Sequence, residues 1–568
     1  MNRIISRIIS KGLRYWVLGV SLFHLFTFSP LHAQPWLKKA AKSVFTVKTF
    51  NADGTLLGSA NGFFIGTGGE AVSSYAPFKG AANAVVIDAN GKELPVTAIL
   101  GGDETYDVVK FMVDSKKTTP LTTYQSTLAT GTNVWMLPYR EAKSCPAGTI
   151  RKTEPFRDSY EYLTLALAAP EDCAGSPLMN EAGEVVGIMQ QAWHQGDTLS
   201  YAVCTRYADS LRITGLSIND PALRAIGIKK ALPSDLSQAQ LTLYVAGASL
   251  DSVAFDALIE DFIQQFPNAP DGYQYRAQRE TDAHQFDKAA RDMEQSIKVA
   301  EKKDEAHFTY SKLIFQKEIY MSELPYDGWS LDKALTEVQE ASRINPQAIY
   351  RHHEATILFA QKKYSEAYQV YTTLFDSEIR SASLFYEASR CQEMLHDSIA
   401  QLALLDSCVA TFSRPYLKEA APYLFTRAEA LLDADRYRPA VNDLNEYEKL
   451  MPGNVNDRFY FIRYQAEVGG RLFQQALNDI DRAIDLRPEY DFYYAEKASL
   501  QVRLGLYDEA LDTAKKCVEL APDSSDGYLF LGLAQCLKGQ KQEGLENLKK
   551  ARELGDSQAD DLIKKYAQ

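Results

Sequence analysis

The sequence predicts a multidomain chain in which an all-β domain precedes an all-α helical solenoid. At 568 residues the chain is too long for one hydrophobic core. Residues 42–215 hold short alternating or β-branched runs, such as SVFTVKTF and GEVVGIM, between Gly and Asn turns, which is typical of a β-barrel or sandwich. From Pro233 onward helical periods replace these runs, and a repeat of about 34 residues indicates a solenoid.

The composition is that of a folded protein with an acidic balance. The chain carries 61 Lys and Arg against 74 Asp and Glu, a formal net charge of −13. Because such a chain attracts phosphate backbones poorly, we expect no nucleic-acid partner. No phosphate loop, metal-ligand spacing or dinucleotide motif stands out, and GTGGE (66–70) is typical of a hairpin turn, so we expect no cofactor and no metal.

The first 33 residues have the layout of a secretory signal peptide. A basic stretch precedes an apolar run from Tyr15 to Phe28, and Ala33 precedes the expected mature start at Gln34. The alternative is a membrane anchor, but the run is shorter than the ~20 residues of a bilayer span. We therefore expect an exported protein, periplasmic or secreted, with no membrane span after cleavage.

Seven cysteines are scattered along the chain. Cys145, Cys173 and Cys204 share the β half and could supply one disulfide, with the pairing left open. The other four lie at periodic helical positions, where we expect them to behave as small buried apolar residues.

The helical half repeats one pattern, anchored on a small residue in the second helix of each unit. These anchors are Ala289, Ala334, Ala367, Ala400, Ala440, Ala476, Ala510 and Gly544. Many units also have an aromatic residue three positions before the anchor, a small residue twelve before it and a proline twelve after it. Small residues let two helices approach closely, and the proline ends the second helix.

This pattern resembles the tetratricopeptide repeat (TPR), as in YDEALDTAKKCVELAP (507–522). The resemblance covers eight units and a degenerate ninth that ends at Pro267. It predicts a longer helix or loop near residues 320–330, where the spacing widens, and a polar cap helix at the end. The expected division is a signal peptide (1–33), a β domain (34–215), a linker (216–235), a TPR solenoid (236–555) and a C-terminal cap helix (556–568).

Three segments of the β half resemble trypsin-like serine proteases of the HtrA type. They are LLGSANGFFIGTGGEAVSSYAPF (56–78), DETYDVVKFMVD (103–114) and EDCAGSPLMNEAGEVVGIM (171–189). In that family the corresponding segments carry, in this order, the catalytic base, the acid and the nucleophile. The resemblance implies a pair of six-stranded β-barrels with a site between them.

Residue by residue, the triad of that family is degenerate in this chain. The base position holds Ala76, the acid position Asp107 and the nucleophile position Ala174. Because a serine hydroxyl needs a neighbouring base to react, we expect a pseudoprotease, not an enzyme, in which Asp107 is a structural acceptor. The domain could still hold an extended peptide by strand addition, or act only as a spacer.

A displaced nucleophile is the alternative from the enzyme class. Ser176 or Cys173 could serve a serine-type peptidase, but neither has an evident base. His194, the one histidine between residues 34 and 235, is expected beyond the site.

In the family that the helical half resembles, the first helices line a binding groove. The residues that we assign to it are Phe425, Glu429, Phe461, Gln465, Ser499 and Arg503. The alternative is a purely structural role, in which these side chains, above all the two phenylalanines, pack within the array.

These observations favour an exported adaptor or scaffold that binds other envelope or extracellular proteins or peptides. The rivals are the non-standard peptidase and a periplasmic holdase for unfolded clients. The oligomeric state stays open.

Overall fold

The computed structural model describes residues 35–139, 145–157, 159–191 and 198–567. The expected signal peptide and His194 lie outside the described residues. The chain divides into two compact units, residues 1–276 and 277–568, and each is described by itself.

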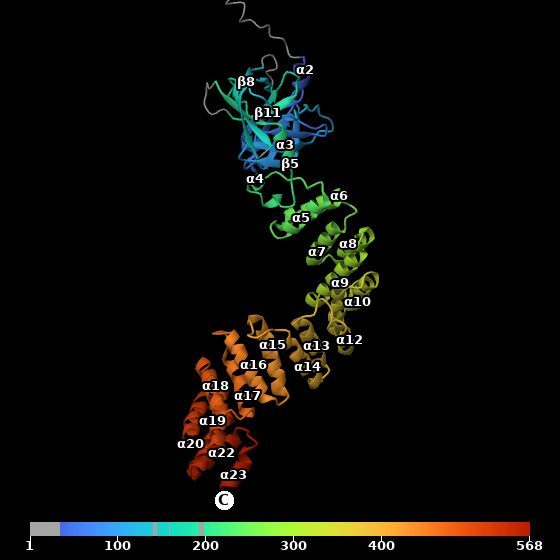
Figure 1. The fold of residues 1–568 in the computed structure, drawn as a ribbon. Helices are drawn as coiled ribbons and strands as arrows, with labels where there is room; N and C mark the ends of the chain where they lie inside the picture. The colour runs from blue at the N-terminus through green and yellow to red at the C-terminus, as the bar shows by residue number, and fades with distance from the viewer. Residues whose placement is uncertain (1–34, 140–144, 158, 192–197, 568) are drawn as a thin grey trace, which may run out of the picture. The chain divides into compact units, whose positions relative to one another are not determined.

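Two closed six-stranded barrels form the β part of the first unit (Figure 1). Around the first barrel run β1 (Val44–Phe50), β2 (Leu56–Phe64), β3 (Glu70–Ser73), β6 (Val108–Val113), β5 (Glu93–Asp103) and β4 (Asn83–Ile87). Around the second run β10 (Pro177–Met179), β11 (Val185–Met189), β12 (Ser200–Cys204), β9 (Tyr160–Ala166), β8 (Ala147–Phe156) and β7 (Asn133–Met136). The predicted double β-barrel is confirmed.

Alternating burial along the strands builds the barrel cores. In β5 the buried apolar side chains are Leu94 and Val96, and then Ile99 after a slip of one position. The slip falls where the register against β6 shifts, between Val96 and Ala98. A bulge of this kind turns the strand, so the inward face continues around the barrel.

The segment after the second barrel returns to the first barrel. It contains α3 (Arg206–Ser210), η2 (Ser217–Asn219) and α4 (Pro221–Arg224). Leu223, Ile226 and Ile228 belong to the core of the first barrel. Ile99 N–H donates to Lys229 O at 2.8 Å. The stretch expected as a linker therefore contributes apolar side chains and backbone bonds to the first barrel.

Helices make up the rest of the chain, as predicted (Figure 1). They are α5 (Leu236–Gly247), α6 (Ser252–Gln265), α7 (Pro270–Asp282), α8 (Phe286–Val299), α9 (Lys303–Tyr320), α10 (Leu331–Ile344), α11 (Ala348–Ala360), α12 (Tyr364–Thr372), α13 (Ala382–Met394), α14 (Ser398–Ala410), α15 (Ala421–Asp433), α16 (Tyr437–Leu450), α17 (Asp457–Gly469), α18 (Phe473–Leu486), α19 (Asp491–Leu504), α20 (Tyr507–Leu520), α21 (Ser525–Leu537), α22 (Lys541–Glu553) and α23 (Ala559–Ala567).

One turn recurs at the end of the first helix in most pairs. A residue with positive φ closes the helix, at His284, Lys362, His396, Asp435, Arg471, Gly505 and Gly539. In each turn the N–H of the following residue donates to the carbonyl five residues earlier, as Leu472 N–H does to Glu467 O at 2.8 Å. This is the Schellman ending, and its recurrence is consistent with a repeat array.

The side chains between the helices repeat as well. Arg427 binds Asp443 with two nitrogens, at 2.7 and 2.8 Å. Arg463, 36 residues later in the printed sequence, binds Asp479 in the same way at 2.6 and 3.0 Å. The anchor Ala476, like most of the anchors, is fully buried. The widened spacing falls on α9, at 18 residues the longest of the described helices, and on the loop that follows it.

All seven cysteines are free thiols in the structure. Cys408 and Cys517 are buried, and each thiol donates to a backbone carbonyl 26 residues earlier. Among the described residues, no helix is both long enough and apolar enough to cross a membrane.

Candidate functional site

The acid position of the β domain is a constrained turn residue. Asp107 precedes β6 and has a φ of 50°. Its carboxylate accepts from Ala76 N–H at 2.7 Å and from the Ser74 hydroxyl at 2.6 Å. Burial raises the pKa of Asp107, and the bonds from Ser74 and Ala76 act against that rise. Asp107 thus fixes the turn at the start of η1 (Ala76–Phe78).

The nucleophile position is held against the first barrel by Asn61. Asn61 N–H donates to Ala174 O at 2.9 Å, and its side-chain amide donates to Asp172 O at 2.5 Å. Asn61 O accepts from the Ser73 hydroxyl at 2.6 Å. The adjacent Ser73 and Ser74 bond to Asn61 and to Asp107. The structure therefore brings the Ala76, Asp107 and Ala174 positions together.

The residues on either side of Ala174 are buried. Gly175 has a φ of +79°, and a Cβ there would collide with the backbone oxygen of Asn61, so only glycine fits. Ser176 is fully buried, and its hydroxyl has no partner among the described residues. The Cys173 thiol is also buried and donates to Gln190 O at 3.3 Å.

An aromatic cluster, which sequence reasoning missed, joins the turn before Asp107 to the second barrel. The rings of Tyr106 and Phe156 stack at 4.0 Å between centroids, and Tyr207 meets both edge-on. Arg157 lies over this cluster and binds Asp103 at 2.5 Å. Aromatic residues in RKTEPFRDSYEY are the only sequence signal, and they do not reveal their partners.

Residues 60–188 match the family model of the trypsin-like peptidase domain. The solved structures that resemble the chain include the active form of the Rv3671c protease from M. tuberculosis, with 18% identity, TM-score 0.28, and coverage of 32% of this chain and 85% of that one. A variant of the HtrA-type protease AlgW with a tripeptide has 18% identity, TM-score 0.29, and coverage of 34% of this chain and 64% of that one. No curated protein matches the chain.

A trypsin-like protease-fold domain is therefore present, and one prediction needs correction. From the degenerate triad we expect a chain that is not an enzyme. That prediction is wrong, because the family model that matches residues 60–188 is that of a peptidase domain. The expectation relied on three positions, whereas the match extends over residues 60–188 of the domain.

The two predicted groove phenylalanines lie among other rings. Phe425 on α15 is half-buried, and its ring centroid lies 5.1 Å from that of Tyr447. Phe461 on α17 is also half-buried, with centroids 5.3 Å from Phe492 and 5.4 Å from Tyr493 on the next first helix. Each ring packs on its neighbours and keeps part of its surface in solvent.

The polar groove residues differ in exposure. Gln465 and Arg503 are exposed, while Glu429 and Ser499 are half-buried. Burial raises the pKa of Glu429 above its ordinary value. Burial also raises the pKa of Glu496, and Arg503 acts against that rise. The surface thus mixes aromatic, acidic and basic groups.

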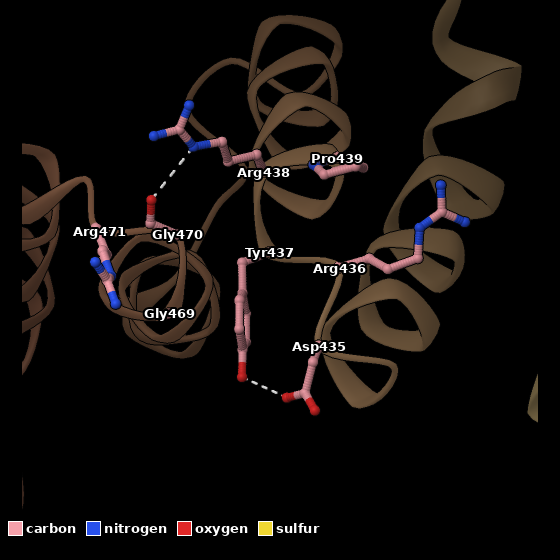
Figure 2. A pocket seen from close by; sticks show the side chains of 8 residues that line it. All are labelled: Asp435, Arg436, Tyr437, Arg438, Pro439, Gly469, Gly470 and Arg471. Carbon is pink, nitrogen blue, oxygen red and sulfur yellow. Dashed lines mark hydrogen bonds between the residues drawn. The ribbon is translucent and has the colours of Figure 1, made fainter.

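A hollow lies at the turns of two neighbouring helix pairs (Figure 2). It has a volume of about 430 Å³, and Arg436, Arg438 and Arg471 line it with the hydrogen-bonded pair Tyr437 and Asp435. The three guanidinium groups point away from one another in Figure 2. They do not converge on one anion, so we assign no ligand to this hollow. No group of metal-binding side chains occurs in the described part of the chain.

Proposed function

We propose that the chain is an exported adaptor that binds other envelope or extracellular proteins through its helical repeats, which we take to be of the tetratricopeptide type. The trypsin-like domain would supply a second binding surface or hold the array in place. The signal-like N-terminus supports export.

The observation that carries this proposal is that three helices, each the first of its pair, have their candidate binding residues at equivalent positions. The fifth residue is Phe425 in α15 and Phe461 in α17. The ninth residue is Glu429 in α15, Gln465 in α17 and Ser499 in α19. Residues four apart lie on the same face of a helix, so these positions form a row that crosses the array. We call Phe425, Glu429, Phe461, Gln465, Ser499 and Arg503 the groove row.

The chemistry of the groove row favours a peptide or helix of mixed character. Its aromatic rings offer apolar contact, and Glu429 and Arg503 offer charges of opposite sign. Tyr464 donates to Glu496 at 3.2 Å, so polar groups beside the row are already ordered. Aromatic residues with a few oriented polar groups are typical of binding hot spots.

Charge reversal on the groove row tests the proposal. We expect the full chain to recover one partner at defined stoichiometry from the source cell envelope after cross-linking. The double variant Glu429→Arg and Arg503→Glu should lose that partner, because each charge would then meet a like charge. Lys515→Glu on α20, which is 58% exposed and absent from the row, is the matched control.

The rival holdase predicts a different result. It would suppress the aggregation of many unfolded clients, and the double variant would act as well as the original chain. Recovery of the same partner by the double variant would contradict the proposal.

A further inference from the structure

A cavity of about 610 Å³ lies in the first unit between residues 213–231 and the helix pair α5 and α6. Its apolar walls include Ile218, Ile228, Leu250 and Leu258. Small-molecule sites range over roughly 300–1,000 Å³ and are mostly apolar, with a few polar groups that fix orientation. The cavity shares no residue with the groove row or with the positions around Asp107.

The charged residues of this cavity are unbalanced. Among the described lining residues Asp261 is the only carboxylate, and it pairs with Lys229 at 2.6 Å. Arg224 and Lys230 also line the cavity, which leaves two positive charges without a carboxylate there. The Lys230 amine donates to the backbone carbonyl of Ile226, and burial lowers the pKa of this lysine. An anion bound between these two side chains would therefore stabilise both cations.

The backbone of this wall is already engaged with the first barrel. Gly227 N–H donates to Ala81 O at 2.8 Å, and Ala231 N–H donates to Ile99 O at 2.9 Å. The wall thus offers side chains to a ligand and few free backbone groups. A peptide that binds by strand addition needs such backbone groups. The cavity therefore favours a ligand held by apolar contact and charge.

We propose that this cavity binds a small amphiphilic anion of the fatty-acid type. The hydrocarbon chain lies against Ile218, Leu250 and Leu258, and the carboxylate binds at Arg224 and Lys230. This inference is independent of the adaptor function.

Fluorescence titration of the full chain tests the proposal. The probe is a dansyl-labelled undecanoate, and the competitor is dodecanoate below its micellar concentration. We expect one probe molecule to bind per chain and dodecanoate to displace it. Dodecan-1-ol, with the same tail and no charge, should displace it at least about tenfold more weakly, since charge-assisted bonds to the carboxylate are lost.

Two pairs of variants locate the site. Ala257→Trp fills the cavity and should abolish probe binding, whereas Gln264→Trp, on the same helix but not in the lining, should leave it unchanged. The double variant Arg224→Gln and Lys230→Gln should weaken dodecanoate binding at least about tenfold. Arg212→Gln, an exposed cation outside the lining, should have no effect. Thermal unfolding of each variant establishes that it is folded.

Three results would overturn the proposal. One is probe binding by folded Ala257→Trp equal to that of the original chain. Another is equal competition by dodecanoate and dodecan-1-ol, which would remove the role of the cations. The third is displacement of the probe by an apolar peptide with an acidic end, but not by dodecanoate, which would make the occupant a peptide.

Discussion

Individual residues of the β domain join its two barrels by backbone contacts. Asn61, on β2 of the first barrel, holds the 172–174 segment of the second through Asp172 and Ala174. Gly175 follows this segment at a φ of +79°, directly against the Asn61 carbonyl. The sequence predicts which residues occupy the triad positions. It does not predict the backbone conformation there, because the residue types alone do not show whether Gly175 or Ser176 has the positive φ.

Gly175→Ala should strongly destabilise the β domain. A non-glycine residue at positive φ costs about 1–2 kcal/mol, and the collision with Asn61 adds to it, so we expect a loss of at least about 3 kcal/mol in urea denaturation. Gly54→Ala is the matched control, since Gly54 has a φ of +82° and open space around it. Equal losses of stability in the two variants would show that a side chain at position 175 does not collide with Asn61.

The carboxyl of Glu467 should make the stability of the array depend on pH. Burial, with repulsion from Asp479, raises the pKa of Glu467 from 4.5 to about 8. Between these values the folded chain keeps a proton that the unfolded chain releases, so the free energy of unfolding falls as pH rises through this window. The fall should be on the order of 5 kcal/mol.

Glu467→Gln removes this titration while keeping the shape of the side chain. Urea denaturation at a series of pH values should then give a flatter profile between about pH 5 and 8. A profile unchanged by the substitution would show that Glu467 titrates normally in the folded chain.

At the scale of elements, recurring turns and ion pairs set the repeat. The helix pairs and their anchors were predictable from the sequence, because small residues and prolines recur at fixed spacing. The Schellman turns were not, since residues as different as Arg471 and Gly505 close them. The ion pairs of Arg427 and Arg463 were also missed, because their carboxylates lie 16 residues away on the next helix.

Replacing a turn residue by glycine should stabilise the array. Arg471 has a φ of 58°, a strained conformation for a side chain, and Arg471→Gly should raise the free energy of unfolding by about 0.5–1 kcal/mol. The reverse change, Gly539→Ala, at a φ of +88° with open space, should lower it by about 1 kcal/mol. Thermal unfolding of both variants measures the two signs, and a destabilised Arg471→Gly would contradict the strain.

Arg463, the buried arginine of α17, should contribute strongly to the stability of the helices around it. Arg463 binds Asp479 on α18, and Glu448 on α16 at 2.6 Å. Arg463→Ala removes the direct ion-pair partner of the buried Asp479 carboxylate and should cost about 3–5 kcal/mol in urea denaturation. A loss below about 1 kcal/mol, the size typical of an exposed pair, would show that the network is solvated.

At the scale of the whole molecule, a peptidase-type domain precedes a long array of helix pairs in one chain. The fold class could be predicted because both halves have strong periodicities. Whether the domain is an enzyme could not be predicted. The triad positions indicate an inactive domain, whereas the family match of residues 60–188 is to a peptidase domain. The cavity beside α6 was also beyond prediction, since its walls come from the expected linker and from two helices.

The central claim is that the groove row binds a partner protein, and a photo-cross-linker placed on it gives the most direct test. The full chain should carry benzoylphenylalanine at Gln465, which is exposed on the row, or at Lys515, which is exposed outside it. We predict one partner, at defined stoichiometry, cross-linked from position 465 and none from position 515. Equal capture at both positions, or no partner at Gln465, would contradict the adaptor function.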